Sequence, residues 1–315
     1  MDPRAFADDL GAKPATLSRM ADVLRSGDPW SDAGVTSENH YVLLGMGSSH
    51  FANSVAAARL RARGVNAVAE LASSDLLPTL TSKSVVIAVS ASGGSVETLD
   101  AVTRYDAPSQ VIALTNVAGS KICSLADRMI EMSAGVETGG VACRSFQHTL
   151  ILLLALEAHL FDEPMPIELV ERASLASAHL INTAGEWLPA LREAMIGPAG
   201  THLVAPARRL SSAQQGALML REGPRLAAIG CETGDWSHID VYLTKTTDYR
   251  LLLFAGSRWE PELLKWVKER GTTLACVSAD VEGSVLSIRY PGDDDDDVRL
   301  LVEVLVPELL ASSLW

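Results

Sequence analysis

Three serine hydroxyls lie within six residues of one another just after an apolar run, in the stretch SVVIAVSASGGSVET at 84–98. The run at 85–89 has the length and continuity of a strand buried on both faces. A small polar turn follows it: Ser90, Ala91, Ser92, Gly93, Gly94 and Ser95. Glycines allow close approach of a ligand, hydroxyls donate hydrogen bonds, and a helix beginning near residue 95 directs its free N–H groups at an anion. This pattern predicts a phosphate-binding turn, and an ordinary connection with Ser95 as N-cap is the alternative.

A second turn of glycines and hydroxyls follows the expected strand at 41–44 and reads GMGSSH. A helix is expected from 51 to 63, so this turn also joins a strand to a helix. The dinucleotide fingerprint GxGxxG would need a third glycine where His50 stands, and no acidic residue ends a suitable second strand. We therefore expect no nicotinamide cofactor.

The expected elements alternate between strand and helix along the whole chain. Strands are expected at 66–71, 111–115 and 129–132, and a long apolar helix at 144–161. After two prolines and two acids at 161–166, helices are expected at 167–180, 186–195, 211–222, 261–270 and 298–310, the last one bent at Pro307, with strands at 201–205, 251–254 and 273–278. This order predicts an α/β fold of doubly wound parallel sheets, with ligands at the carboxyl ends of the strands.

Composition narrows the classes of function. The chain has 315 residues and a net charge of -13 without basic clusters, which argues against binding to nucleic acid or to an anionic membrane. There is no leader-like N-terminus and no apolar run long enough to span a membrane, so we expect a cytoplasmic protein. Four scattered cysteines and seven histidines lack ligand spacing, so neither disulfides nor a structural metal is expected.

The motifs GMGSSH, SASGGSVET, NVAGS, GVACRSFQHTL and QQGALMLRE occur in this order. In order and spacing they resemble the SIS (sugar isomerase) family, in particular the isomerase domain of glucosamine-6-phosphate synthase. The resemblance implies a helical segment at 1–28, SIS domains at 29–165 and 166–315, no glutaminase domain, and no cofactor. It also implies a homodimer that binds a phosphorylated sugar, and the apolar helix around 149–156 would then need covering.

The resemblance also assigns roles to single residues. The phosphate would be bound by Ser90, Ser92 and Ser95, with Ala91 in place of a glutamine and Gly93 between them. The sugar would be lined by Met46, Gly47, Ser48 and Ser49, and covered by a loop that holds Val141 and Cys143. Glu222 matches the carboxylate that moves a proton between the first two sugar carbons, and His238 the histidine that helps to open the ring.

Taken without the resemblance, Glu222 would cap or pair at a helix end beside Arg221, and His238 would be a surface histidine. His50, Arg144 and Arg208 are weaker candidates for the ligand edge. The sequence departs from the synthase motif at Met219, which replaces a lysine, and at Gln215, which replaces a glutamate. Residues 205–207 read APA where the synthase has glycine-arginine-glycine. We also expect this chain to lack the lysine-bearing tail of the synthase. We expect a phosphosugar isomerase of hexose or aminohexose phosphates. An aminosugar-phosphate deaminase or fructosyl-amine-phosphate deglycase is one alternative, and a non-catalytic phosphosugar sensor is another.

Overall fold

The computed structural model describes residues 1–105 and 110–315, which form two compact units. The first unit comprises residues 15–137 and 142–171, and the second comprises residues 1–14, 138–141 and 172–315. Each unit contains one sheet of five strands, and every strand pairing in both sheets is parallel. The expected α/β fold of two helix-flanked parallel sheets is therefore confirmed. The domain limits expected at residues 28 and 165 remain a prediction.

The sheet of the first unit has the strand order β2-β1-β3-β4-β5. Its strands are β1 (His40–Gly45), β2 (Asn66–Leu71), β3 (Ser84–Val89), β4 (Gln110–Thr115) and β5 (Arg128–Glu131). The central strand β3 is buried along its whole length, which explains its uninterrupted run of branched apolar residues. The chain reverses its direction of winding between β1 and β3, and this is the point of an open parallel sheet where ligands bind.

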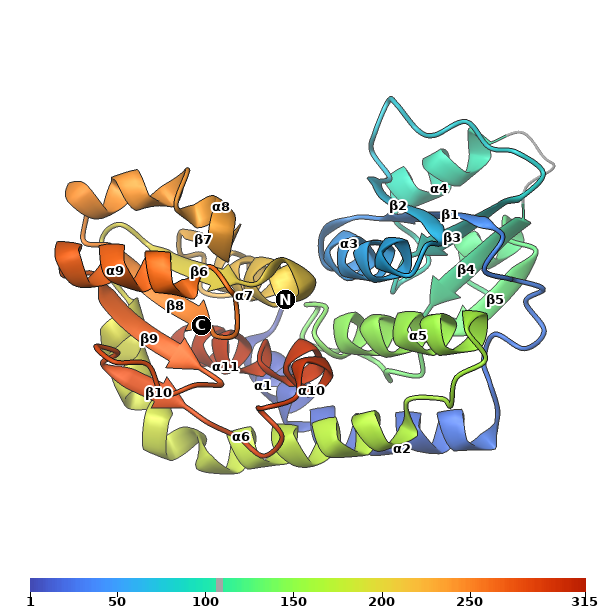
Figure 1. The fold of residues 1–315 in the computed structure, drawn as a ribbon. Coiled ribbons are helices and arrows are strands. Elements are labelled where there is room, and N and C mark those ends of the chain that lie inside the picture. Colours follow the sequence, from blue (N-terminus) through green and yellow to red (C-terminus); the bar gives the residue numbers. More distant parts are fainter. Residues whose placement is uncertain (106–109) are drawn as a thin grey trace. The chain divides into compact units, whose positions relative to one another are not determined.

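Helices cover both faces of this sheet. They are α2 (Lys13–Ser26), α3 (Gly47–Ala62), α4 (Val96–Thr103), the 3-10 turn η1 (Lys121–Ser124) and α5 (Arg144–Leu160). Figure 1 shows α4 on one face of the sheet and α5 on the other, where α5 packs against α3. Residues Leu150 to Leu156 of α5 are buried within this chain, so this apolar stretch gives no argument for a second copy.

The sheet of the second unit has the strand order β10-β9-β8-β6-β7. Its strands are β6 (Thr201–Ala205), β7 (Ala228–Glu232), β8 (Arg250–Phe254), β9 (Thr273–Val277) and β10 (Leu286–Ile288). The helical elements are α1 (Pro3–Gly11), η2 (Ala207–Arg209), α7 (Leu210–Glu222), α8 (Thr233–Trp236), η3 (Asp240–Lys245), α9 (Glu260–Arg270), α10 (Asp296–Val302) and α11 (Leu305–Leu314). In Figure 1, α8 and α9 lie together on one face of this sheet, and α7 packs against α11.

Several expectations about single elements were wrong. The two helices expected at 167–195 form one helix, α6 (Ile167–Met195), which continues through Pro189. The C-terminal helix is two helices rather than one bent at Pro307, because that proline lies in the first turn of α11, where a missing N–H costs little. The helix α1 lies within the segment 1–28, which was expected to be helical. The edge strands β7 and β10 had not been expected at all. They are short or carry glycine and serine, so their hydrophobic pattern is weak.

Within the described residues, no helix is both long and apolar enough to cross a membrane. In the same part of the chain, no group of three or more potential ligands is arranged to hold a metal ion. All four cysteines are free thiols.

Candidate functional site

The turn after β3 is held in place by hydrogen bonds to the end of β4 and to the loop that follows β4. Ser90 is 5% exposed, and its N–H donates to the carbonyl of Leu114 on β4 at 3.0 Å. The Ala91 carbonyl accepts from the N–H of Asn116 at 3.0 Å and from the Thr115 hydroxyl at 3.3 Å. Because these bonds anchor its base, the turn presents Ser92 and Gly94 to solvent in a fixed conformation.

Gly93 allows the turn to approach the loop after β4 more closely than any side chain would permit. Its φ is +64°, in the region that favours glycine, and a Cβ built there would lie 1.9 Å from Oγ of Ser120. The Gly93 carbonyl accepts from the N–H of Ile122 at 3.0 Å. The strand-to-helix turn and the loop at 116–120 therefore form one packed unit.

Ser95 is the N-cap of α4, as the sequence predicts. Its Oγ accepts from the N–H of Thr98 at 3.4 Å and donates to a carboxylate oxygen of Glu97 at 3.0 Å. The pKa of the exposed Glu97 carboxyl is lowered by its own backbone N–H and by the Ser95 hydroxyl. Within the described residues, the N–H groups of Ser92 and Val96 have no acceptor. Two backbone donors and the hydroxyls of Ser90 and Ser92 are thus available to an anion, with the carboxylate of Glu97 at their edge.

The turn after β1 lies beside this turn, because Leu44 of β1 pairs in register with Ala88 of β3. The chain enters α3 through Met46 as N-cap and Gly47, whose φ is +47°. Ser48 and Ser49 form the first turn of α3 and are partly exposed. The register therefore brings together the expected sugar-lining residues and the expected phosphate turn at one edge of the first sheet.

His50 follows these residues on α3 and is half-buried. Burial lowers the pKa of its imidazole, against the opposing effect of the Glu70 backbone and carboxylate. Its Nε2 lies 3.4 Å from the Ser54 hydroxyl. His50 is therefore more often neutral near pH 7 than a free histidine, and it adds little positive charge to this edge.

The N-terminus of α5 is occupied by a carboxylate of the same chain. Oε1 of Glu137 accepts from the N–H groups of Cys143, Arg144 and Ser145, at 2.7, 2.6 and 3.1 Å. Cys143 is fully buried as the N-cap residue, and Arg144 is 5% exposed and donates to the Val136 carbonyl. The guanidinium of Arg144, expected as a weaker candidate for the ligand edge, thus binds the loop at 135–137. Glu137 had not been singled out, although an acid shortly before a helix is a recognisable capping signal.

Val141 belongs to the segment 138–141, which groups with the second unit, and it is 3% exposed. The segment is fixed to α1: the N–H of Gly139 donates to Asp9 at 2.8 Å, and its carbonyl accepts from the N–H of Asp2 at 3.1 Å. The loop that the resemblance assigns to cover the sugar is therefore held by α1, which lies in the N-terminal segment expected to be helical.

Glu222 is the last residue of α7 and is partly buried. Burial raises the pKa of its carboxyl, and the neighbouring Arg221 acts in the opposite direction. Within the described residues, no hydrogen-bond partner is found for this carboxylate. The ring of Trp315 packs against the adjacent Gly223, where an added Cβ would lie 3.0 Å from it. A raised pKa and a free carboxylate suit a group that accepts and returns a proton.

His238 is exposed and follows the short helix α8. It lines a pocket of about 310 Å³ that is rich in carboxylates: the other lining residues are Glu232, Gly234, Asp235, Trp259 and Glu262. Glu232 caps α8 by accepting from the N–H groups of Gly234 and Asp235 at 2.7 and 2.9 Å. His238 therefore presents an exposed imidazole to a pocket whose other lining residues include three carboxylates.

The turn after β8 is the counterpart of the phosphate turn in the second sheet, and it is already occupied. Glu260 at the start of α9 accepts from the N–H groups of Gly256 and Ser257. Arg208, a weaker candidate for ligand binding, pairs instead with Asp296 and donates to the Gly256 carbonyl at 2.7 Å. Of these two turns, only the turn after β3 thus leaves backbone donors available to an external anion.

The family similarity found for this chain lies mainly in the first unit. Residues 35–158 match the SIS domain. This stretch, which is less than half of the chain, is similar to the SIS domain family. It contains both turns at the carboxyl edge of the first sheet, so the motifs that resemble the family lie in the part that matches it.

Most of the chain is also similar to part of a larger protein. It is 27% identical over 258 residues to the isomerizing glutamine–fructose-6-phosphate aminotransferase of Methanosarcina acetivorans, covering 74% of this chain and 40% of that protein. The chain thus spans less than half the length of this relative.

Two solved structures share the fold. The C-terminal domain of glucosamine-fructose-6-phosphate aminotransferase from Francisella tularensis has a TM-score of 0.80 at 16% identity and covers 98% of this chain and 95% of its own. Tagatose-6-phosphate ketose/aldose isomerase from Escherichia coli has a TM-score of 0.79 at 15% identity, with 98% and 92% covered. At these identities the likeness concerns the fold.

Proposed function

We propose that this protein binds a phosphorylated hexose or aminohexose and interconverts its aldose and ketose forms. The observation that supports this most is the turn at 90–95, which combines free backbone donors, three serines and the N-terminus of α4. The SIS domain match covers this turn, and the names of similar proteins include both a phosphosugar aminotransferase with isomerizing activity and a ketose/aldose isomerase.

Glu222 is the proposed base. It would take the proton from C2 of an open-chain aldose phosphate, which leaves an enediolate. The proton of the C2 hydroxyl then moves to O1, and Glu222 returns its own proton to C1 to give the ketose. One carboxylate suffices for both transfers, so no amine nucleophile is needed. This agrees with the sequence, which has the buried Met219 where the synthase motif has lysine.

His238 is the proposed acid for ring opening, since it must protonate the ring oxygen before an aldehyde can form. Its exposed imidazole, which lines a pocket of about 310 Å³, supports that role. We also propose a homodimer, because the resemblance implies that this histidine completes the site of a second copy. Light scattering tests this part, and a fully active monomer at assay concentration would overturn it.

A turnover screen tests the proposed reaction. The purified protein is incubated with hexose, aminohexose and fructosyl-amine phosphates, and NMR follows the conversion of aldose to ketose and the release of ammonia or amine. Isomerisation without amine release is the expected result. Amine release would favour a deaminase or deglycase, and tight binding without any turnover would favour a sensor.

The variant Ser92→Asp links this activity to the phosphate turn, because a carboxylate there would repel the phosphate. Ser37→Asp is the matched control: it adds the same charge at an exposed serine before β1, at the opposite end of the strands. Calorimetry should show loss of sugar-phosphate binding only for Ser92→Asp. Equal binding by both variants would show that the phosphate is bound elsewhere.

A further inference from the structure

Four buried side chains form a continuous hydrogen-bonded chain in the second unit. Nε1 of Trp236 donates to the hydroxyl of Tyr249 at 2.9 Å, and that hydroxyl donates to Oδ2 of Asp240 at 2.8 Å. Nδ1 of His202 lies 3.2 Å from the same oxygen, and its ring stacks on Tyr249 with centroids 3.8 Å apart. The Tyr249 hydroxyl is therefore used fully, once as acceptor and once as donor.

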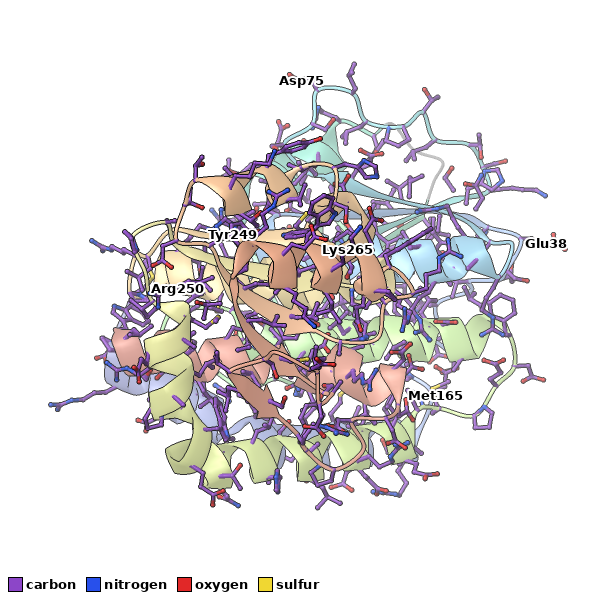
Figure 2. All side chains as sticks on the ribbon, turned by 60° about the vertical axis from the view of Figure 1, so that its left-hand side comes forward. Glu38, Asp75, Met165, Tyr249, Arg250 and Lys265 are labelled. Atoms are coloured by element: carbon purple, nitrogen blue, oxygen red, sulfur yellow. The ribbon has the colours of Figure 1, made fainter. Side chains whose placement is uncertain are left out.

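These side chains come from separate parts of the chain: His202 lies on β6, Trp236 on α8 and Asp240 on η3, and Tyr249 immediately precedes β8. Figure 2 marks Tyr249 beside Arg250, the first residue of β8. None of the four is more than 5% exposed. A polar network this deeply buried is costly unless every member is paired, so loss of its central hydroxyl affects several contacts at once.

The network fixes the segment that carries His238. Trp236 and Asp240 lie two residues before and two residues after it, and both are anchored by Tyr249. Between these anchors the chain turns outward: the N–H of His238 donates to the Asp235 carbonyl at 2.8 Å, and its side chain is exposed. The imidazole thus faces the pocket from a backbone held on both sides.

The electrostatics of Asp240 agree with this arrangement. Burial alone would raise its pKa, but the hydrogen bonds from His202 and Tyr249 outweigh burial and hold the pKa below its usual range. Cys231 also interacts with Asp240 and Tyr249, and Asp235 and Glu232 in turn interact with Cys231. Burial raises the pKa of the Cys231 thiol to about 12, so it stays protonated. Asp240 therefore remains a charged acceptor for the Tyr249 hydroxyl near pH 7.

We propose that Tyr249 is a positioning residue for His238. Its hydroxyl joins Trp236 to Asp240 and so keeps the segment 236–240 in the conformation that presents the imidazole to its pocket. This inference rests on the proposed function, because the positioning matters for turnover only if His238 transfers a proton. It concerns residues outside the SIS domain match.

Tyr249→Phe tests the inference because it keeps the ring and its stacking but removes the hydroxyl. Tyr290→Phe is the matched control: Tyr290 is also a buried tyrosine of the second unit, and its hydroxyl bonds Ser278 at 2.9 Å, away from this segment. Amide hydrogen exchange within 236–240 should become roughly tenfold faster in Tyr249→Phe and stay unchanged in Tyr290→Phe. Unchanged exchange in Tyr249→Phe, or the same increase in both variants, would overturn the inference.

Steady-state kinetics then separate positioning from general loss of stability. In Tyr249→Phe, kcat should fall at least fivefold while KM and phosphate affinity hold, because the turn at 90–95 is untouched. A loosened segment with unchanged kcat would overturn the positioning role. His238→Ala separates the proposed role of His238 from that of Tyr249. If His238→Ala turns over substrate like the wild type, the proposed role of His238 fails. If His238→Ala is inactive and Tyr249→Phe is fully active, the proposed function stands and only the role of Tyr249 fails.

Discussion

Gly93→Ala should distort the phosphate turn, and the geometry around this residue indicates by how much. At φ +64° an alanine is strained, which costs about 1–2 kcal/mol. The new Cβ would lie 1.9 Å from Oγ and 2.4 Å from Cβ of Ser120, and overpacking of this kind costs roughly 1–3 kcal/mol. The first unit should therefore lose about 2–5 kcal/mol of stability, or move the turn to avoid the loss. Either response disturbs the free backbone donors of Ser92 and Val96.

The neighbouring glycine provides the control. Gly94 does not have a positive φ, and a Cβ there would meet only Oγ of Ser92 at an ordinary 3.8 Å. Gly94→Ala should leave unfolding in urea unchanged within about 0.5 kcal/mol. In the double variant Gly93→Ala/Ser120→Gly the two closest contacts disappear and the contact with Oγ1 of Thr115 at 3.1 Å remains, so about 1–2 kcal/mol of backbone strain should be the main cost left.

Two measurements check this prediction. Urea unfolding gives the stability of each variant, and calorimetry with inorganic phosphate and with sugar phosphates gives the affinity. Gly93→Ala should lose most phosphate binding, and Ser120→Gly introduced beside it should restore part of it. If Gly93→Ala unfolded and bound phosphate like Gly94→Ala, the close packing of this turn against the loop at 116–120 would not be what shapes the site.

Three further predictions concern charge. Glu97→Gln should tighten phosphate binding severalfold in calorimetry, because the carboxylate lies 3.0 Å from the Ser95 hydroxyl and repels a dianion; weaker binding would contradict this. Arg221→Gln should move the acidic limb of the pH–rate profile to higher pH, since Arg221 lowers the pKa of Glu222, which acts only when deprotonated; a shift to lower pH would exclude this base. Calorimetry should find one phosphate per chain, because Glu260 occupies the corresponding turn of the second sheet, and two equal sites would refute that reading.

The sequence predicted those parts of the fold whose signal is local. The fifteen residues at 84–98 are enough to predict the strand β3 and the serine-glycine turn after it, and Ser95 caps α4 as expected. The long helix α5 contains a continuous apolar stretch at 150–156, and its helical conformation could also be recognised from its residues alone. Where one hydrophobic run or one capping residue determines an element, the sequence is sufficient.

Features that depend on distant residues could not be predicted in this way. Gly139 is fixed by Asp9, which lies 130 residues away, and the network at Tyr249 joins residues from β6 to β8. The occupation of the second turn by Glu260 requires knowing that the two sheets have equivalent turns. Nothing in the residue types distinguishes a serine that will bind phosphate from one that only caps a helix, so the roles at 90–95 came from the resemblance.

The role of Glu222 is the claim on which the account depends most, and hydrogen exchange at C2 of a bound sugar phosphate tests it directly. The sugar is incubated with protein in deuterated water and followed by NMR, with Glu222→Gln compared against Glu186→Gln, an exposed site on α6. The account predicts exchange in the wild type and in Glu186→Gln, and at least a ~100-fold slower exchange in Glu222→Gln, while binding survives. Equal exchange in all three proteins would remove Glu222 from the mechanism, and no exchange in any of them would contradict the isomerase reaction itself.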